Sequence, residues 1–347
     1  MEERYSDCSK IKERLPIYQV GKNVCANAPK VSVVIPAYNV AEFIAETLDS
    51  ALAQTFQDFE IIVVNDGSPD SAQLEKILLP YFDKIIYIKQ ENSGVAAARN
   101  TAILASRGTI LAFLDGDDIW FPEYLASQIE FLETNGYEMV YCNALFFGEK
   151  CYKYETYMEQ SHSKGKVTPS SLLKTDCNVI TSGTIVLKNR LQKYGLFALD
   201  APRIEDFELW FRLSKHNVKI AYQREVLLKY RIRLGSLTGN NVERAERTIK
   251  ALEIVKEKNE LTETELQIWH KRMQISQAEL NLEKGKSYLA EGKFAEARAS
   301  FLKANKQQRK YKLTIIIWLL AVNPKLVLIL FKNRRAEEFA FILPKHS

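Results

Sequence analysis

The first part of the chain alternates short apolar runs with amphipathic stretches. Four apolar runs, rich in β-branched residues, predict buried strands: 31–38, 60–68, 84–90 and 109–118. Between them, apolar residues recur at helical spacing over 41–54 and 93–106, which predicts helices. Strands that alternate with helices indicate an α/β fold with a mostly parallel sheet between helices.

The pattern changes twice further along the chain. Three segments resemble strands or loops that complete the domain: 144–148, 178–188 and 219–232. A helix is predicted over 205–216, and from about Asn241 onward helical periodicity dominates while Gly and Pro become rare. We therefore expect a polar lead-in of uncertain structure over 1–29, a catalytic domain over 30–240 and an all-helical region over 241–347.

Composition and charge predict where the protein is located and which kind of surface its C-terminal region contacts. A chain of 347 residues suits one catalytic domain with an appendage. Its net charge of +5 is uneven, because residues 301–347 hold ten Lys or Arg against only Glu337 and Glu338. Such a tail favours an acidic surface, for example anionic lipid. The five cysteines form no CxxC pair, and the polar start resembles no signal peptide, so we expect a cytoplasmic protein.

Carboxylates follow the last of the four apolar runs. Asp115, Asp117 and Asp118 come at the end of the predicted strand 109–118. Hard oxygen ligands of this kind suit Mg²⁺ or Mn²⁺ shared with a substrate's phosphates. The alternative is a polar turn that caps a helix near Ile119. Three carboxylates this close would repel one another without a cation, which favours the metal interpretation.

Asp66 ends the neighbouring predicted strand. An Asp-Gly turn is common and needs no function. However, ligands of parallel α/β sheets bind at the carboxyl ends of the strands, where Asp66 and the Asp115–Asp118 cluster are both expected.

Taken together, these segments resemble the family 2 inverting glycosyltransferases with the A-type nucleotide-sugar-binding fold. The resemblance runs from about Val31 to Thr238 and rests on VSVVIPAYN, EIIVVNDGS, ENSGVAAARN, ILAFLDGDD and IEDFELWFRL in that order. It implies a nucleotide-sugar donor, here expected to be a UDP-sugar, together with a hydroxyl acceptor and a divalent cation, Mn²⁺ or Mg²⁺.

The resemblance also implies roles for individual residues. The donor site would comprise Pro36, Ala37, Tyr38, Asn39, Asp66, Gly94, Arg99, Asp115 and Gly116. The first four and Asp66 would lie against the nucleotide base, Arg99 in the same pocket and Asp115 at the ribose. Asp117 would hold the metal that bridges the diphosphate, and Asp118 would help to orient these groups.

Glu205 and Asp206 resemble the acidic pair at the head of the family's acceptor-side helix, whose second member is the usual general base. Such a carboxylate takes the proton of the attacking hydroxyl. Acidity at a helix N-terminus also has a purely structural explanation, since it complements the helix dipole. Arg233 stands where many relatives carry His; Arg cannot ligate a metal but can clamp a diphosphate.

The helical tail carries two further patterns. Small and large residues fit a single tetratricopeptide-like hairpin: Gly285, Tyr288, Gly292, Ala297, Phe301 and Ala304. The apolar stretch 313–331 is interrupted by Asn323-Pro324-Lys325 and flanked by basic clusters. It favours either shallow contact with an anionic membrane surface or a buried helical hairpin over a full membrane span.

Other functions fit the sequence less well. A nicotinamide oxidoreductase would need G-x-G-x-x-G after the first strand, where this chain has residues 36–39. A sugar nucleotidyltransferase would need a Gly-rich basic loop there, and a non-catalytic scaffold would not need the aspartates. We expect a transferase of hexosyl or N-acetylhexosaminyl groups in cell-surface polysaccharide or lipopolysaccharide synthesis. Its acceptor would be a sugar or lipid-linked sugar, and no nucleic-acid partner is expected.

Overall fold

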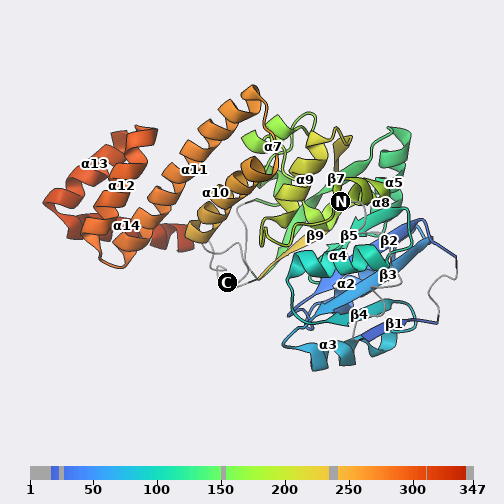
Figure 1. Ribbon diagram of the computed structural model, residues 1–347. Coiled ribbons are helices and arrows are strands. Elements are labelled where there is room, and N and C mark those ends of the chain that lie inside the picture. The colour runs from blue at the N-terminus through green and yellow to red at the C-terminus, as the bar shows by residue number, and fades with distance from the viewer. Residues whose placement is uncertain (1–16, 23–26, 150–153, 234–240, 310, 341–347) are drawn as a thin grey trace. The chain divides into compact units, whose positions relative to one another are not determined.

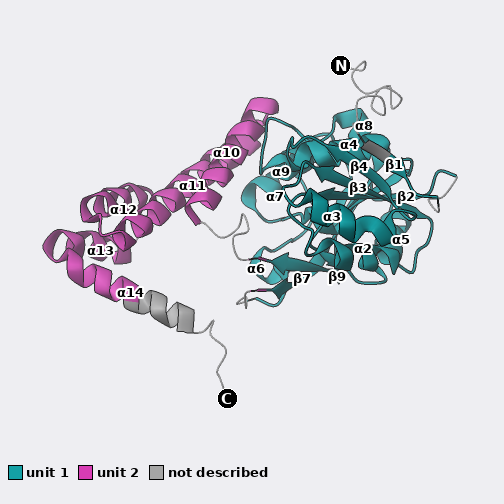
Figure 2. Ribbon diagram, turned by 90° about the horizontal axis from the view of Figure 1, so that it is seen from below, with its two compact units in different colours: residues 1–148, 152–232 teal, residues 149–151, 233–347 magenta. Residues whose placement is uncertain are grey.

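The structure is a computed structural model that describes residues 17–22, 27–149, 154–233, 241–309 and 311–340 (Figure 1). The chain divides into two compact units, one of residues 1–148 with 152–232 and one of residues 149–151 with 233–347 (Figure 2). The predicted boundary near Asn241 follows a segment, 234–240, that lies outside the described residues.

The predicted strands form the parallel half of the first unit's sheet. They are β2 (Val31–Ala37), β3 (Phe59–Asp66), β4 (Ile86–Gln90) and β5 (Ile110–Phe113). Their order is β4-β3-β2-β5, and each neighbouring pair is parallel. The strands are linked by α2 (Ile44–Leu52), α3 (Ser71–Leu78), the 3₁₀ helix η2 (Leu79–Tyr81) and α4 (Val95–Ala105). The apolar strand residues are almost entirely buried, as continuous apolar runs require.

The other half of the sheet is mixed. β5 pairs antiparallel with β8 (Thr184–Leu187), which pairs antiparallel with β7 (Met139–Gly148). β9 (Ile220–Ile232) runs parallel to β7, and β6 (Ile119–Trp120) antiparallel to β9. The remaining helices are α5 (Tyr124–Thr134), α6 (Tyr157–Gln160), α7 (Pro169–Lys174), η3 (Thr181–Gly183), α8 (Lys188–Tyr194) and α9 (Glu205–Lys215). The α/β fold class is confirmed, with parallel pairing concentrated in the N-terminal half.

Part of the predicted lead-in belongs to the sheet. β1 (Ile17–Val20) pairs antiparallel with β4 at the sheet edge.

A tight turn follows β3. Gly67, directly after this strand, has a φ of +60°, and a Cβ there would lie 2.5 Å from the backbone nitrogen of Asn92. Only glycine tolerates both conditions, so this turn brings the end of β3 close to the loop before α4.

The second unit is helical, as predicted. It contains α10 (Asn241–Lys258), α11 (Glu263–Ala290), α12 (Phe294–Gln308), α13 (Tyr311–Val322) and α14 (Pro324–Ala340). Gly285 of α11 lies against the ring of Phe301 of α12, and a Cβ at Gly285 would be 2.4 Å from that ring. This small-against-large contact supports the prediction of a tetratricopeptide-like hairpin, which stays a prediction.

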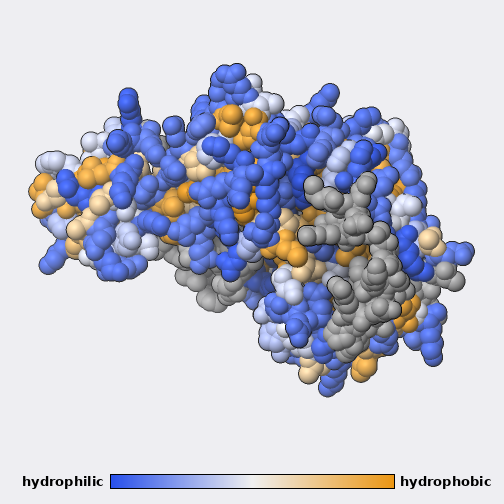
Figure 3. Space-filling view, viewed as in Figure 1, coloured by the Kyte–Doolittle hydropathy of each residue, from blue (hydrophilic) through white to orange (hydrophobic). Residues whose placement is uncertain are grey.

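The last two helices are apolar on more than one side. Four residues are buried in a core shared with α11 and α12: Leu313, Ile317, Leu320 and Val327. Others are exposed: Ile315, Trp318, Val322, Leu326, Ile329 and Leu330. Figure 3 shows hydrophobic surface around α13. Among the described helices, none is both long enough and apolar enough to cross a membrane.

Candidate active site

The acidic cluster forms a turn after β5. β5 ends at Phe113, and the backbone nitrogen of Asp118 donates to the carbonyl oxygen of Asp115 at 3.1 Å. The prediction that the strand continues through these aspartates is therefore wrong, because the chain turns back to start β6. A residue of η3 also holds the turn in place, since the backbone nitrogen of Asp115 donates to Oγ of Ser182 at 3.0 Å.

The three carboxylates of this acidic turn differ in burial. Asp118 is buried: its Oδ1 accepts a hydrogen bond from the backbone nitrogen of Arg231 at 2.9 Å, and its Oδ2 has no partner. Burial, followed by the negative charges of Asp117 and Asp115, raises the pKa of Asp118 well above its usual range. Asp115 and Asp117 are partly exposed, so they are the two that a ligand can reach.

Arg99 of α4 bridges the acidic turn to α9. Its Nη2 lies 2.7 Å from Oδ1 of Asp115 and its Nη1 lies 3.1 Å from Oε1 of Glu205. The guanidinium also sits 5.4 Å from the ring centroid of Phe197. Burial lowers the pKa of Arg99, but the two carboxylates outweigh it and raise the pKa overall, so the side chain stays charged. The predicted contact of Arg99 with the nucleotide stays a prediction, and the structure adds this internal role.

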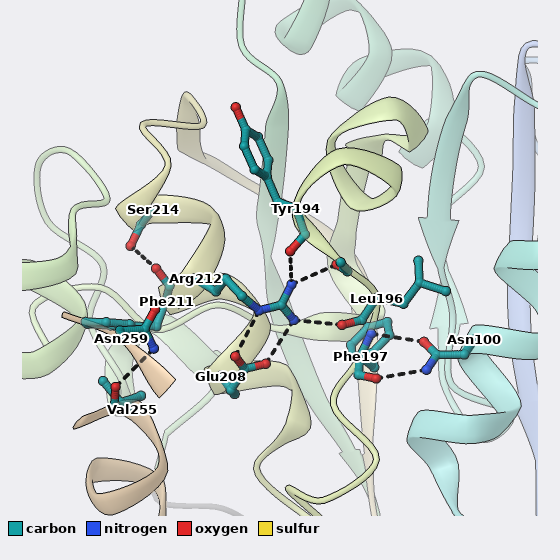
Figure 4. Close-up of polar contacts among 11 residues, drawn as sticks. Asn100, Tyr194, Leu196, Phe197, Glu208, Phe211, Arg212, Ser214, Val255 and Asn259 are labelled. Atoms are coloured by element: carbon teal, nitrogen blue, oxygen red, sulfur yellow. Dashed lines mark hydrogen bonds and ion pairs between the residues drawn. The ribbon is translucent and has the colours of Figure 1, made fainter. Parts of the chain in front are cut away.

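Hydrogen bonds to the 194–197 segment hold α9 in place (Figure 4). Arg212 of α9 donates to the carbonyl oxygens of residues 194, 195 and 196 and is paired with Glu208 at 2.9 Å. Asn100 of α4 exchanges two hydrogen bonds, of 2.8 and 3.0 Å, with the backbone of Phe197. Together these bonds connect α9 to α4 through the 194–197 segment.

The acidic pair at the start of α9 is asymmetric. Glu205 is buried against Arg99, and burial, followed by the charge of Asp206, raises its pKa. Asp206 is half-buried; its Oδ2 accepts from Oγ1 of Thr181 at 3.2 Å, and its Oδ1 accepts from the backbone nitrogen of Phe207 at 2.7 Å. Of the two carboxylates, Asp206 is therefore the one that an acceptor can approach.

Asp66 organises the loop before α4. Its Oδ1 accepts from Nε2 of Gln90 at 2.6 Å and from the backbone nitrogen of Ser93 at 3.0 Å, and its Oδ2 accepts from the backbone nitrogen of Gly94 at 2.8 Å. Gly94 precedes α4 with a φ of +88°. The buried carboxylate thus shapes this loop, and its predicted contact with a nucleotide base stays a prediction.

The loop 36–39 adjoins both aspartate-bearing turns. The backbone nitrogen of Asn39 donates to Oγ of Ser68 at 2.6 Å, beside the end of β3. A Cβ at Gly116 would lie 3.1 Å from the carbonyl oxygen of Pro36, so the acidic turn packs closely on this loop. Ala37 is buried, whereas two side chains are exposed: Tyr38 and Asn39. The predicted donor-site segments therefore meet at the carboxyl ends of β2, β3 and β5.

Some residues of the site gave no signal in the sequence. Thr181 and Ser182 of η3 join Asp206 to the acidic turn, yet they lie in a segment predicted only as strand or loop. Three aromatic rings also cluster with centroid separations of 5.9 to 6.1 Å: Phe146, Tyr157 and Tyr230. The charge of Asp206 contributes to raising the pKa of Tyr157, after burial, so this aromatic cluster lies near the acidic pair.

Arg233 directly follows β9. The rest of the predicted closing segment, 234–240, lies outside the described residues, and the diphosphate-clamp role of Arg233 stays a prediction.

The side chains fit a cation that is shared with a substrate. Within the described ranges no three His, Cys, Asp or Glu side chains come together as a metal-binding group. Mg²⁺ commonly takes only one or two carboxylates and completes its shell with water and substrate phosphates. The two accessible aspartates of the acidic turn, Asp115 and Asp117, match that requirement, and Asp117 remains the predicted ligand.

Comparisons with known proteins find relatives among glycosyltransferases. The profile of "Glycosyl transferase family 2" matches residues 32–195. An uncharacterized glycosyltransferase of Rickettsia prowazekii is 36% identical over 223 residues, which span 63% of this chain and 69% of the relative. The Escherichia coli UDP-Glc:alpha-D-GlcNAc-diphosphoundecaprenol beta-1,3-glucosyltransferase WfaP is 33% identical over 215 residues, 60% of this chain and 80% of the relative.

Solved structures share the fold at low sequence identity. Staphylococcus aureus TarS 1–349 in complex with UDP has a TM-score of 0.55 at 16% identity, covering 81% of this chain and 92% of that one. The mannosyltransferase PcManGT from Pyrobaculum calidifontis, in complex with GDP-Man and Mn²⁺, has a TM-score of 0.57 at 17% identity, covering 94% and 92%. The profile match and the relatives above 30% identity show that the chain belongs to glycosyl transferase family 2.

Proposed function

We propose that this glycosyltransferase moves a hexosyl or N-acetylhexosaminyl group from a UDP-sugar to a hydroxyl acceptor, with inversion and with Asp206 as general base. The observation that carries the proposal is the half-buried Asp206, held by Thr181 at the start of α9, beside a buried ion-pair bridge from Glu205 through Arg99 to Asp115. This bridge links the acceptor-side carboxylate to the donor-side turn.

The proposed reaction is a single displacement. Asp206 accepts the proton of the acceptor hydroxyl as its oxygen forms a bond to C1 of the donor sugar. The bond from C1 to the diphosphate oxygen breaks on the opposite face, and UDP leaves with the electron pair. Glu205 is buried and paired with Arg99, so an acceptor hydroxyl cannot reach it, whereas Asp206 keeps a surface toward solvent.

Asp117 is the proposed metal ligand, with Asp115 next to it at the donor. Asp117 would hold a divalent cation, Mn²⁺ or Mg²⁺, which would supply positive charge to offset the negative charge of the leaving diphosphate. Arg99 orients the Asp115 carboxylate through its 2.7 Å contact. The Mn²⁺ in the PcManGT complex supports this choice of cofactor.

A lipid-linked saccharide is the proposed acceptor. By its name, WfaP acts on a GlcNAc-diphosphoundecaprenol, and this similarity supports a role in cell-surface polysaccharide synthesis. We further propose that the exposed apolar residues of α13 and α14, with nearby basic residues such as Lys312 and Lys332, contact an anionic membrane surface from the cytoplasmic side.

A thermal-shift experiment tests the donor and metal parts of the proposal. UDP should raise the melting temperature of the wild type more with Mn²⁺ than with EDTA, because a cation held by Asp117 would add binding energy for the diphosphate. Asp117→Asn should remove this difference and leave the melting temperature without ligand nearly unchanged.

Asp83→Asn is the matched control. This substitution also removes one negative charge. Asp83 is exposed and precedes β4, so it lies at the end of that strand opposite the candidate active site. The variant should keep the wild-type difference between UDP stabilisation with Mn²⁺ and with EDTA. Equal stabilisation by UDP with Mn²⁺ and with EDTA in the wild type would refute the metal role.

A further inference from the structure

Arg231, near the end of β9, is held between two aromatic rings. Its guanidinium carbon lies 4.7 Å from the ring centroid of Phe43, just before α2, and 4.3 Å from that of Phe147 of β7. Only 12% of the side chain is exposed. A cation placed on two ring faces and largely removed from water is attracted by both, so the side chain is confined in position.

The same residue makes two hydrogen bonds to the acidic turn. Its Nε donates to the carbonyl oxygen of Asp117 at 2.7 Å, and its backbone nitrogen donates to Oδ1 of Asp118 at 2.9 Å. Its Nη2 also pairs with Glu46 of α2. The Glu46 side chain is 60% exposed, so solvent screening leaves this ion pair a small part of the total.

We infer that Arg231 is a positioning residue for the divalent cation. By fixing the peptide group of Asp117 and one oxygen of Asp118, it sets the shape of the turn and hence the direction of the Asp117 carboxylate. The inference rests on the proposed metal role of Asp117. Groups that orient a metal ligand commonly matter nearly as much as the ligand itself.

The chemistry of this contact requires arginine. Nε of Arg231 donates a hydrogen bond to the backbone carbonyl oxygen of Asp117, while the planar guanidinium lies between the rings of Phe43 and Phe147. Lysine has a single compact ammonium at the end of its side chain and cannot reproduce both contacts at once. Arg231→Lys therefore keeps the charge but loses the fixed geometry.

The experiment measures the dissociation constant of UDP by calorimetry, once with Mn²⁺ and once with EDTA. The ratio of the two constants reports how well the protein presents its metal ligand. In Arg231→Lys and Arg231→Met this ratio should fall by about tenfold to a hundredfold, the usual effect of losing a group that orients a metal ligand. The constant measured in EDTA should stay within a few-fold of wild type.

Lys229→Met is the matched control. Lys229 lies on the same strand, and its Nζ sits 5.4 Å from the ring centroid of Phe121, so the substitution also removes a cation from an aromatic ring. It should keep the wild-type ratio. If the Arg231 variants melt at lower temperature but keep the wild-type ratio, Arg231 is only structural and the inference is overturned.

Failure of the proposed metal role would be visible separately. In that case the wild type itself would bind UDP equally with Mn²⁺ and with EDTA, which overturns both proposals. A wild type that responds to Mn²⁺, together with an unchanged ratio in the Arg231 variants, overturns only the inference about Arg231.

Discussion

Glu205 and Asp206 are adjacent in the sequence but lie in different surroundings. Arg99 lies against Glu205, whereas Asp206 accepts hydrogen bonds from the Thr181 hydroxyl and from the backbone nitrogen of Phe207. From the sequence alone, both are candidate bases. The burial of Glu205 depends on Arg99, which lies more than a hundred residues away in the chain. The family resemblance favoured Asp206, and the difference in burial supports the same choice.

Asp206→Asn should reduce kcat by roughly two to four orders of magnitude, the usual contribution of a general base. The amide keeps the shape of the side chain and an oxygen that can accept from Thr181, so the affinity for UDP should stay near that of the wild type. Steady-state kinetics together with UDP calorimetry provide the check. A variant that retains more than about a tenth of wild-type kcat would contradict the role, since that loss is far below the range expected of a base.

Motifs located the candidate residues, but contacts over long sequence distances determine how they are arranged. Asp66, Asp115 and Asp117 could be found from the sequence because each follows a recognisable apolar run. Ser182 and Arg231 could not, because no local pattern shows that a serine 67 residues away or an arginine 114 residues away contacts the acidic turn.

At the scale of elements, apolar runs predicted the strands of the parallel half well. They overestimated the length of the strand before the acidic turn, since β5 ends at Phe113 and the last residues of that run form the turn. β1 gave no clear apolar signal because it is a short edge strand. The pairing of β5, β8, β7 and β9 depends on tertiary contacts that hydrophobic periodicity does not encode.

The packing of α11 on α12 allows a test of the helical unit. Replacing a helical glycine with alanine usually stabilises a protein by about 0.5 to 1 kcal/mol. At Gly285 the new methyl group would meet the ring of Phe301 at 2.4 Å. Gly285→Ala should therefore destabilise the protein, by about 1 to 3 kcal/mol as overpacking does, measured by urea unfolding.

Two further variants sharpen this test. Ser287→Ala changes an exposed position of the same helix and should have little effect. Adding Phe301→Leu to Gly285→Ala should recover part of the loss, because the two positions are in contact. An increase in stability for Gly285→Ala alone would show that the two helices do not pack this closely.

At the scale of the whole molecule, one side of α13 and α14 completes a helical core, and another side is exposed and apolar. Contact of this exposed side with a membrane stays a prediction. Deleting α13 and α14 would remove the buried core residues and the exposed apolar residues together. Substitutions confined to the exposed side separate membrane contact from folding, since they leave the core residues Leu313, Ile317 and Leu320 in place.

Trp318→Ser combined with Ile329→Ser should weaken co-sedimentation with anionic vesicles at low salt and leave the melting temperature nearly unchanged. Wild-type binding should decrease as salt rises, because basic residues near the bilayer contribute up to about 1 kcal/mol each and are screened by ions. Ile275→Ser, at an exposed apolar position of α11, is the control and should bind as wild type does. A wild type that ignores vesicles at every salt concentration would contradict membrane contact.

The stereochemistry of the product tests the central claim most directly. Wild-type enzyme would be incubated with Mn²⁺, a panel of α-linked UDP-sugars and a GlcNAc-diphospholipid analogue, and the new linkage would be assigned by proton NMR. Direct displacement assisted by Asp206 predicts a β-linked product, with no product from Asp206→Asn on the same timescale. An α-linked product would contradict the account, because it requires retention at C1 and a different arrangement of catalytic groups.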